Sequence, residues 1–337
     1  MALPANVTLI LCSRERPSLL RDALASVAAA TPADVDVLVV DSGSTTDATG
    51  RVAREANVRC VRTDVRGLSI ARNVGLRATD REIVVFTDDD CLATAGWIEA
   101  LLPHFDAPDV GVVTGRMLAH TKVGSTEEYH HKSRFTDVAD GLDAGHGALM
   151  AFRRAPLVSL GGFDEVLGAG RELAGAEDLD AFCRMIDVGW RVVHEPTSVV
   201  HHVYTRVGEN YRDLLYGYGL GMGALARKWS RIDRSTGRVM LTVALSRQLR
   251  KAARALPRRR ARARAELAMF GGIVRGYALA SRLRLHGTVF VDAHRPEPIV
   301  LSGAAESSAP DALPDDDTPG AADVPVALTR KGRADAS

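Results

Sequence analysis

The feature that most constrains the fold is a regular alternation of short apolar runs and longer amphipathic stretches. The apolar runs are rich in Val and Ile, which favours strands, and the stretches between them have helical spacing. The predicted strands are Val7–Cys12, Asp36–Val40, Val58–Arg62, Ile83–Thr87 and Val110–Gly115. The predicted helices are Pro17–Ala30, Asp47–Ala56, Leu68–Ala78 and Thr94–Leu102. This alternation predicts right-handed crossovers and an α/β fold, with a mostly parallel sheet flanked by helices.

Three consecutive carboxylates, Asp88, Asp89 and Asp90, follow the predicted strand Ile83–Thr87. Like charges this close raise each other's pKa unless a cation lies among them, and a divalent metal ion is the simplest such cation. Ligands of parallel α/β sheets bind just beyond the carboxyl ends of the strands, where this triplet lies. The alternative is an acidic loop in which Asp88 or Asp89 caps the next helix.

A second polar strand end lies at Asp41, which is followed by Ser42, Gly43 and Ser44. Its carboxylate could accept hydrogen bonds from a nucleotide base or a ribose, or the segment could be a tight turn with a helix cap. Arg72 lies on the helix before the acidic strand. It could bind a diphosphate through paired hydrogen bonds or lie on a solvated helix face, and the same alternatives hold for its neighbour Asn73. The chain contains neither a GxGxxG sequence nor a P-loop sequence.

In their order along residues 6–205, these motifs resemble those of the family 2 glycosyltransferases, which have the GT-A fold. The matching motifs are Cys-Ser-Arg-Glu-Arg-Pro (12–17), Val-Val-Asp-Ser-Gly-Ser (39–44), Gly-Leu-Ser-Ile-Ala-Arg-Asn-Val-Gly (67–75), Phe-Thr-Asp-Asp-Asp-Cys (86–91), Arg-Arg (153–154), Gly-Gly-Phe-Asp-Glu (161–165), Glu-Asp-Leu-Asp (177–180) and Pro-Thr-Ser-Val-Val-His-His (196–202). The resemblance implies a GT-A type nucleotide-binding sheet. It also implies an inverting, metal-dependent transfer of a sugar, hexosyl-like, from a nucleotide-diphosphate sugar to an acceptor hydroxyl.

On the donor side, the resemblance implies that Asp41 reads the nucleotide base. Asp88 and Asp90 correspond to the two acids of the DxD motif, and Asp89 fills the variable middle position. Asp88 would touch the ribose or the metal, and Asp90 would ligate Mg²⁺ or Mn²⁺, ions that prefer oxygen ligands. The residues expected to bind the nucleotide sugar are Asp41, Arg14, Arg72, Asn73, Asp88 and Asp89.

On the acceptor side, Glu177 and Asp178 open a predicted helix that runs to about Val188. The helix dipole favours anions at this position, so simple helix capping is one interpretation. By resemblance, Asp178 is the general base that takes the proton of the acceptor hydroxyl, and Glu177 orients it or contacts the acceptor. Asp180 points elsewhere on the helix and could pair with Arg184.

The resemblance also assigns His202, as a third metal ligand or a diphosphate contact, although a histidine near the core is the alternative. His201 should point to the opposite face of its strand. The asparagine that the family has near position 149 is Leu149 here, so no acceptor contact is assigned there. His146 either compensates for this departure or is a loop histidine. The polar stretch His120–Asp143 is either a lid or acceptor-binding segment or a mobile insertion.

The rear of the chain is basic. Residues 206–295 contain 20 Lys and Arg against 5 Asp and Glu, a net charge of +15, whereas the remainder carries −14. The predicted helices there are Asn210–Arg231, Leu241–Leu256 and Glu266–Leu285, with an arginine-rich segment, Pro257–Arg264, between the last two. Arginines beside apolar helix faces suit an anionic membrane surface, and a nucleic-acid patch or a solvated face are the alternatives.

The whole-chain features suggest a cytoplasmic protein, peripheral on the inner face of the cell membrane. The four cysteines lack CxxC spacing, which is typical of a reducing compartment. The N-terminus has no signal-peptide pattern, and no apolar run reaches the length of a membrane span. We expect a donor of nucleotide-sugar type, a sugar, lipid-linked or small-molecule acceptor, and no nucleic acid partner.

The expected organisation is a GT-A domain at residues 1–205, with a nucleotide-sugar half to about 118 and an acceptor half from about 119. A basic helical extension at 206–300 and a disordered tail at 301–337 would follow. One alternative function is a catalytically inactive sugar-nucleotide-binding protein with an Arg-rich interaction surface, but the retained Asp88, Asp90 and Asp178 argue against it. A nucleotidyltransferase would usually carry a glycine-rich loop after the first strand, and Ser13–Pro17 has no glycine.

Overall fold

The computed structural model describes residues 3–119, 133–203, 208–257 and 259–301. Nine strands of this part form one sheet, in the order β3-β2-β1-β4-β8-β6-β9-β5, with β7 also paired to β9. The strands are β1 (Val7–Ser13), β2 (Asp36–Ser42), β3 (Arg59–Thr63), β4 (Ile83–Asp88), β5 (Cys91–Ala93), β6 (Val110–Ala119), β7 (Arg134–Phe135), β8 (Leu149–Arg153) and β9 (Arg191–His202). Strands β1 to β4 are parallel, whereas β8 is antiparallel to both β4 and β6. The predicted mixed, mostly parallel sheet is therefore confirmed.

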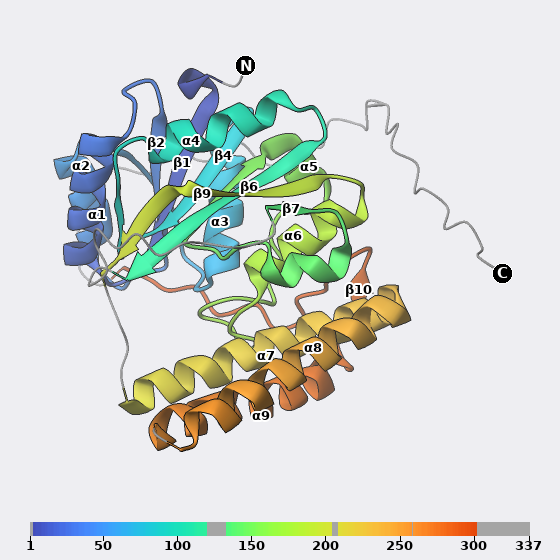
Figure 1. Cartoon of the computed structure of the whole chain (residues 1–337). Helices are drawn as coiled ribbons and strands as arrows, with labels where there is room; N and C mark the ends of the chain where they lie inside the picture. Colours follow the sequence, from blue (N-terminus) through green and yellow to red (C-terminus); the bar gives the residue numbers. More distant parts are fainter. Residues whose placement is uncertain (1–2, 120–132, 204–207, 258, 302–337) are drawn as a thin grey trace.

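Helices cover both faces of this sheet (Figure 1). They are α1 (Pro17–Ala30), α2 (Ala48–Glu55), α3 (Leu68–Arg77), α4 (Trp97–Leu101), α5 (Arg154–Ser159) and α6 (Glu177–Asp187), with short 3₁₀ turns at Pro4–Asn6, Leu102–Asp106 and Val138–Asp143. Side chains alternate between the faces along each strand. Leu9 and Leu11 of β1 therefore pack with α1, α2 and α4 in one core cluster. Ile10 packs with α3, α5 and α6 in the other.

The sheet brings the two acidic strand ends to one edge, as the alternation predicted. Strand β1 lies between β2 and β4, so Ser13 pairs with Asp41 on one side and Cys12 pairs with Asp88 on the other. Because all three strands run in the same direction, Asp41 and Asp88 both lie at the carboxyl edge. The expected convergence of the two acidic strand ends is therefore present, and nucleotide binding at this edge stays a prediction.

The segment after the acidic triplet differs from the prediction of a helix at Thr94–Leu102. Cys91–Ala93 instead forms β5, antiparallel to β9, with Cys91 opposite His202. The helix begins only at Trp97, because Gly96 adopts a left-handed backbone with φ of 75°. Strand β6 also continues past the predicted Gly115 to Ala119, since its second half pairs with the end of β9. Strand β5 and the longer β6 thus both come from pairing with the distant strand β9.

Three long helices form a layer beside the sheet, in yellow and orange in Figure 1. They are α7 (Gly208–Ile232), α8 (Arg234–Ala255) and α9 (Arg260–Ala280), and a small hairpin, β10 (Leu285–His286) and β11 (Val289–Phe290), follows them. The predicted C-terminal helices are therefore present. Helix α7 packs so closely on α9 that a Cβ at Gly223 would overlap the Ile273 carbonyl. None of the described helices is both long enough and apolar enough to cross a membrane.

Helix α9 begins at Arg260 rather than at the predicted Glu266, so the arginines up to Arg264 lie in its first turns. Arg258 and the predicted disordered tail from residue 302 lie outside the described residues, as does the part of the polar stretch at 120–132. The boundary at residue 205 stays a prediction.

Candidate active site

The acidic triplet contains a cation from the protein itself. Arg16, from the loop after β1, places Nη1 3.1 Å from Asp89 Oδ1 and 3.2 Å from Asp90 Oδ2. The Ser13 hydroxyl donates to Asp89 Oδ2 at 2.7 Å. Both oxygens of the buried Asp89 carboxylate are thus engaged by protein donors. The expectation that a cation lies among the three acids is met in part by Arg16, which sequence reasoning did not single out.

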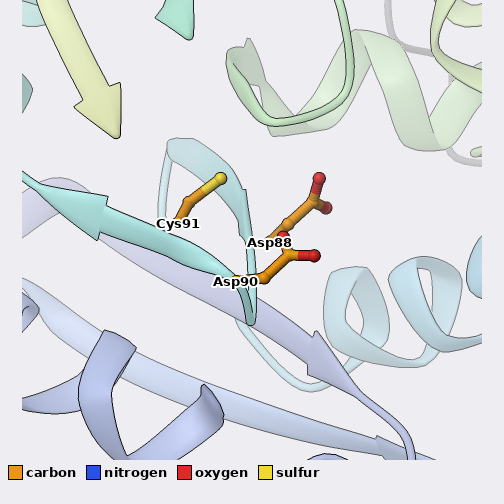
Figure 2. Close-up of side chains that lie close together, drawn as sticks. All are labelled: Asp88, Asp90 and Cys91. Carbon is orange, nitrogen blue, oxygen red and sulfur yellow. The ribbon is translucent and has the colours of Figure 1, made fainter. Parts of the chain in front are cut away.

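Asp88 and Asp90 come together in a group that could hold a metal ion (Figure 2). One ligand atom from each of Asp88, Asp90 and Cys91 lies within 4.8 Å of the others. Burial raises the pKa of the Cys91 thiol far above its usual range, so this group stays protonated. The two carboxylates are therefore the available ligands, and oxygen donors suit Mg²⁺ or Mn²⁺. Burial also raises the pKa of Asp88 to about 6, although the Arg72 guanidinium opposes this shift.

The pairing of β5 with β9 brings His202 to the same loop. Its Nε2 lies 3.5 Å from Asp90 Oδ2, and the hydrogen bond to Asp90 raises the pKa of His202. The interpretation of His202 as a histidine near the core is not supported, because its side chain is 27% exposed and faces an acid of the triplet. Its role as a third metal ligand stays a prediction.

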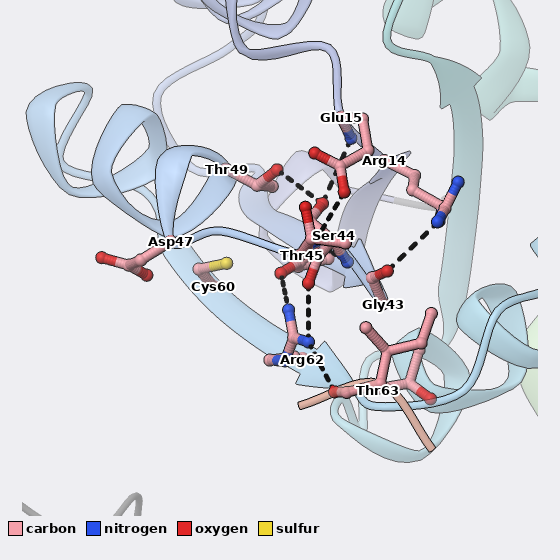
Figure 3. Close-up of polar contacts among 12 residues, drawn as sticks. Arg14, Glu15, Gly43, Ser44, Thr45, Asp47, Thr49, Cys60, Arg62 and Thr63 are labelled. Atoms are coloured by element: carbon pink, nitrogen blue, oxygen red, sulfur yellow. Dashed lines mark hydrogen bonds and ion pairs between the residues drawn. The ribbon is translucent and has the colours of Figure 1, made fainter. Parts of the chain in front are cut away.

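Asp41 is buried at the end of β2. Figure 3 shows the turn that follows it, with Gly43 and Ser44. Asp41 Oδ1 accepts from the Ser44 amide at 3.0 Å, and its Oδ2 pairs with Arg62 Nη1 at 2.5 Å. Arg14, from the loop after β1, donates through Nε to the Gly43 carbonyl at 3.2 Å. Asp41 thus forms the tight turn that the sequence allowed, and a base-reading role for Asp41 and Arg14 stays a prediction.

Arg72 is the most deeply placed cation of the site, with a side chain only 2% exposed. Its Nη1 lies 2.8 Å from Glu177 Oε1, and its Nη2 lies 3.7 Å from Asp88 Oδ1. The guanidinium also lies over the rings of Phe86 and Phe163, at 6.0 and 5.4 Å from their centroids, in cation–π geometry. The interpretation of a solvated helix face is therefore wrong for Arg72. The residue links Asp88, at the end of β4, to Glu177, at the start of α6.

The neighbouring Asn73 uses its amide to hold the loop at residues 161–165. Its Nδ2 donates to the Phe163 carbonyl at 2.9 Å and to Glu165 Oε1 at 3.0 Å, and its Oδ1 accepts from the Phe163 amide at 2.8 Å. This side chain is buried, so the solvated interpretation is wrong here too. The contacts describe a residue that shapes the site wall, and its predicted contact with the nucleotide sugar stays a prediction.

Glu177 and Asp178 begin α6 after a left-handed residue, Ala176, with φ of 63°. Burial, with Asp178 as a like charge beside it, raises the pKa of Glu177 to about 7, against the opposing effect of Arg72. Asp178 Oδ1 accepts from the Leu179 amide at 2.8 Å. Its Oδ2 would lie 3.4 Å from a Cβ at Gly147, so it faces the loop before β8.

His146, in that loop, is a site residue that sequence reasoning left undecided. Burial lowers the pKa of His146, and the negative charges of Asp178 and Asp88 oppose this shift, so the ring lies within the electrostatic reach of both acids. Its Nδ1 is buried and has no hydrogen-bond partner among the described residues. The glycine after it, Gly147, was the available signal, because it lets the backbone pass close to Arg72 and Asp178. Leu149 is fully buried in β8, so it offers no polar contact to an acceptor.

Comparison with known proteins identifies the domain. Residues 8–158 match the model of glycosyl transferase family 2. This stretch of the chain is a family 2 glycosyltransferase domain. The chain is 28% identical over 215 residues to the pre-mycofactocin glycosyltransferase of Mycobacterium tuberculosis, a match that covers 58% of this chain and 42% of that protein. It is 26% identical over 213 residues to the O-antigen chain rhamnosyltransferase RfbN of Salmonella typhimurium, covering 58% of this chain and 66% of that protein.

A solved structure shares the fold of this glycosyltransferase domain and of the helices after it. The mannosyltransferase PcManGT from Pyrobaculum calidifontis, in complex with GDP-Man and Mn²⁺, superposes with a TM-score of 0.58 at 22% sequence identity. The match covers 82% of this chain and 87% of that one. The GT-A fold expected from the motifs is therefore confirmed. The chain spans less than half the length of the mycobacterial relative.

Proposed function

We propose that this chain transfers a sugar, of hexosyl type, from a nucleotide-diphosphate sugar to an acceptor hydroxyl, with inversion at the anomeric carbon. One observation carries the proposal. Arg72 is a single buried side chain that joins Asp88, at the donor-side strand end, to Glu177, at the start of α6. The strand end that is proposed to bind the nucleotide and the pair of acids at the start of α6 are thereby held at one site. A direct displacement between donor and acceptor needs this arrangement.

Asp178 is the general base in this proposal. Its Oδ2 lies beside Gly147, and the salt bridges of the described residues include none to Asp178, so this oxygen is available to take a proton from an acceptor hydroxyl. Glu177 is already engaged by Arg72 and orients the start of α6. One base on the acceptor side is sufficient for an in-line displacement, and such a displacement inverts the anomeric carbon.

Asp88 and Asp90, with His202 as a third ligand, would hold Mg²⁺ or Mn²⁺ in this proposal. The fit rests on their proximity and on the oxygen-rich donor set. When bound, such an ion supplies positive charge to the departing nucleoside diphosphate. Asp41 and Arg14, on either side of the turn at Gly43, are proposed to contact the base and ribose, and Asp89 acts by holding Arg16 beside Asp90.

The test is a panel of UDP-, GDP- and dTDP-sugars assayed for hydrolysis with Mn²⁺ or Mg²⁺, with NMR of the released sugar. We expect one donor class to be used and the first product to have the inverted anomeric configuration. Asp178→Asn should lower the rate by at least about 10²-fold, because an amide cannot accept the proton, while nucleotide affinity is kept. Asp187→Asn, at the other end of α6, is the matched control. A retained configuration, or wild-type turnover in Asp178→Asn, would contradict the mechanism.

We also propose that the helical layer meets an anionic membrane, where the acceptor would be a lipid-linked sugar or lipid. The helical layer exposes Leu256 (59%), just after α8, and Leu267 (49%) and Val274 (51%) of α9. Helical spacing places Arg264, Leu267, Val274 and Arg275 on one face of α9. Apolar side chains between arginines suit the interface of a membrane with anionic lipids.

Vesicle flotation tests this proposal. Each arginine near an anionic surface contributes on the order of 1 kcal/mol, so a variant with glutamine at Arg259, Arg260, Arg262 and Arg264 should lose binding to anionic vesicles but keep donor hydrolysis. The control is a variant with glutamine at four exposed arginines far from this layer, Arg21, Arg51, Arg54 and Arg77. Equal binding of both variants, or binding to neutral vesicles that salt does not weaken, would contradict it.

A further inference from the structure

A lysine near the C-terminal end of α7 is completely buried inside a cluster of charges. Lys228 of α7 places Nζ 2.5 Å from Asp164 Oδ2 and 2.7 Å from Asp180 Oδ1. All three side chains have 0% exposure. Burying an ammonium group is costly unless it is paired and hydrogen-bonded. The contact is therefore a specific junction between α7 and the glycosyltransferase domain.

The remaining hydrogen bonds of the cluster reach two further segments. Asp180 Oδ2 accepts from Arg184 Nε at 2.8 Å, and Arg184 also donates to the Gly162 carbonyl at 2.6 Å. Asp164 Oδ2 accepts from the amide of Phe290, which follows the helical layer, at 2.8 Å. Two carboxylates and two cations balance, so the cluster is neutral only while Lys228 is present.

This cluster lies directly behind the acceptor-side acids. Asp180 is in the first turn of α6, two residues after Asp178. The backbone of α7 approaches the turn that starts this helix, because a Cβ at Gly221 would overlap the Gly175 carbonyl. Asp164 belongs to the loop that Asn73 holds from the other side. The first turn of α6 is thus held by Arg72 of α3, through Glu177, and by Lys228 of α7, through Asp180.

We propose that Lys228 is a positioning residue for the acceptor-side acids, through its bonds to Asp180 and Asp164. It sets the direction in which Glu177 and Asp178 leave the first turn of α6, and it makes helix α7 part of the acceptor site. This inference rests on the proposed role of Asp178. A merely structural anchor would hold the helical layer in place without any effect on turnover by folded enzyme.

Two variants test the proposal. Lys228→Met removes the ammonium and leaves an excess buried negative charge. The double variant Lys228→Met with Asp164→Asn makes the cluster neutral again, because Asp180 is still paired with Arg184. It replaces the single variant in the assays if the single variant does not fold. The control is Arg231→Met, one turn further along α7, whose exposed guanidinium contacts only the Leu283 carbonyl in the described hydrogen bonds.

The first readout is hydrolysis of the donor sugar with Mn²⁺. In folded variants we expect kcat to fall about tenfold or more, since small misplacements of a catalytic group are costly, with the donor KM and the Kd of GDP or UDP unchanged. Arg231→Met should keep the wild-type kcat. Wild-type kcat in the folded double variant overturns the proposal. So does a parallel loss of nucleotide affinity, which would indicate general disruption.

The second readout is amide hydrogen exchange across residues 177–187, which requires no turnover. Exchange in the first turn of α6 should become faster in both Lys228 variants but not in Arg231→Met. If the wild-type protein hydrolyses no nucleotide sugar, the proposed function fails, whereas the exchange experiment still decides whether Lys228 holds this turn. Unchanged protection of the first turn in both variants overturns the positioning role.

Discussion

The affinity of the acidic loop for Mn²⁺ should weaken as the pH falls, and protonation of His202 should account for most of this loss. His202 Nε2 lies 3.5 Å from Asp90 Oδ2, and this hydrogen bond raises the pKa of His202 above its usual 6.5. Burial raises the pKa of Asp88 to about 6. A metal ligand must lose its proton before it can bind. Binding is therefore complete above both pKa values and is lost as the pH falls through them.

The size of the effect follows from these two groups. Between about pH 8 and about pH 5.5, proton competition at His202 weakens binding by at least about tenfold, because its pKa is no lower than 6.5. Competition at Asp88 adds about fourfold. Together they weaken binding about 40-fold, or about 2 kcal/mol, since each tenfold change corresponds to about 1.4 kcal/mol.

Titration calorimetry with Mn²⁺ over this pH range measures the effect. His202→Gln should lower the affinity at high pH and leave only the roughly fourfold dependence that Asp88 contributes. His201→Gln is the matched control, because His201 is adjacent on β9 and its side chain points to the other face of the strand. It should keep the full dependence. If the wild-type protein and His202→Gln lose affinity equally as the pH falls, His202 is not a metal ligand and the reasoning is refuted.

Two further predictions concern the buried polar contacts of the site. Arg72→Met should lower the free energy of unfolding by about 3–5 kcal/mol, because Glu177 is left buried without its counter-ion. Denaturant unfolding measures this loss. A loss below about 1 kcal/mol would show that the pair is not a buried one. Asn73→Leu should cost about 1–3 kcal/mol, because the Phe163 amide and carbonyl lose their side-chain partner, and its thermal midpoint should fall accordingly. An unchanged midpoint would mean that water replaces the amide.

The first four strands could be predicted from the sequence because their signals are local. Runs such as Leu9–Leu11 and Ile83–Phe86 are buried on both faces, so they are apolar throughout, and the helices between the strands have a clear period. The convergence of Asp41 and Asp88 then follows from topology alone. Strand β5 could not be predicted in this way. Its three residues are a strand only because the end of β9 lies beside them, and no local pattern indicates this pairing.

The cations of the site were harder to predict than its acids. A carboxylate at a strand end is placed by the strand, whereas the direction of a long arginine side chain depends on what packs around it. Arg72 shows this difference. Its neighbours on α3 allow either a solvated or a buried face, and only the rings of Phe86 and Phe163 and the facing Glu177 determine which one forms.

The acidic triplet shows why the cations matter to the chemistry. Elementary electrostatics requires a cation among three adjacent carboxylates, and from the sequence we expected a metal ion to be that cation. The fold supplies a separate partner to each acid: Arg72 to Asp88, Arg16 to Asp89 and His202 to Asp90. Arg16 lies 3.1 Å from Asp89 and 3.2 Å from Asp90, so at the proposed metal site it would stay with Asp89 when Asp90 binds the ion. The middle acid would then act by holding Arg16, and the loop would keep a cation among its acids both with and without a metal.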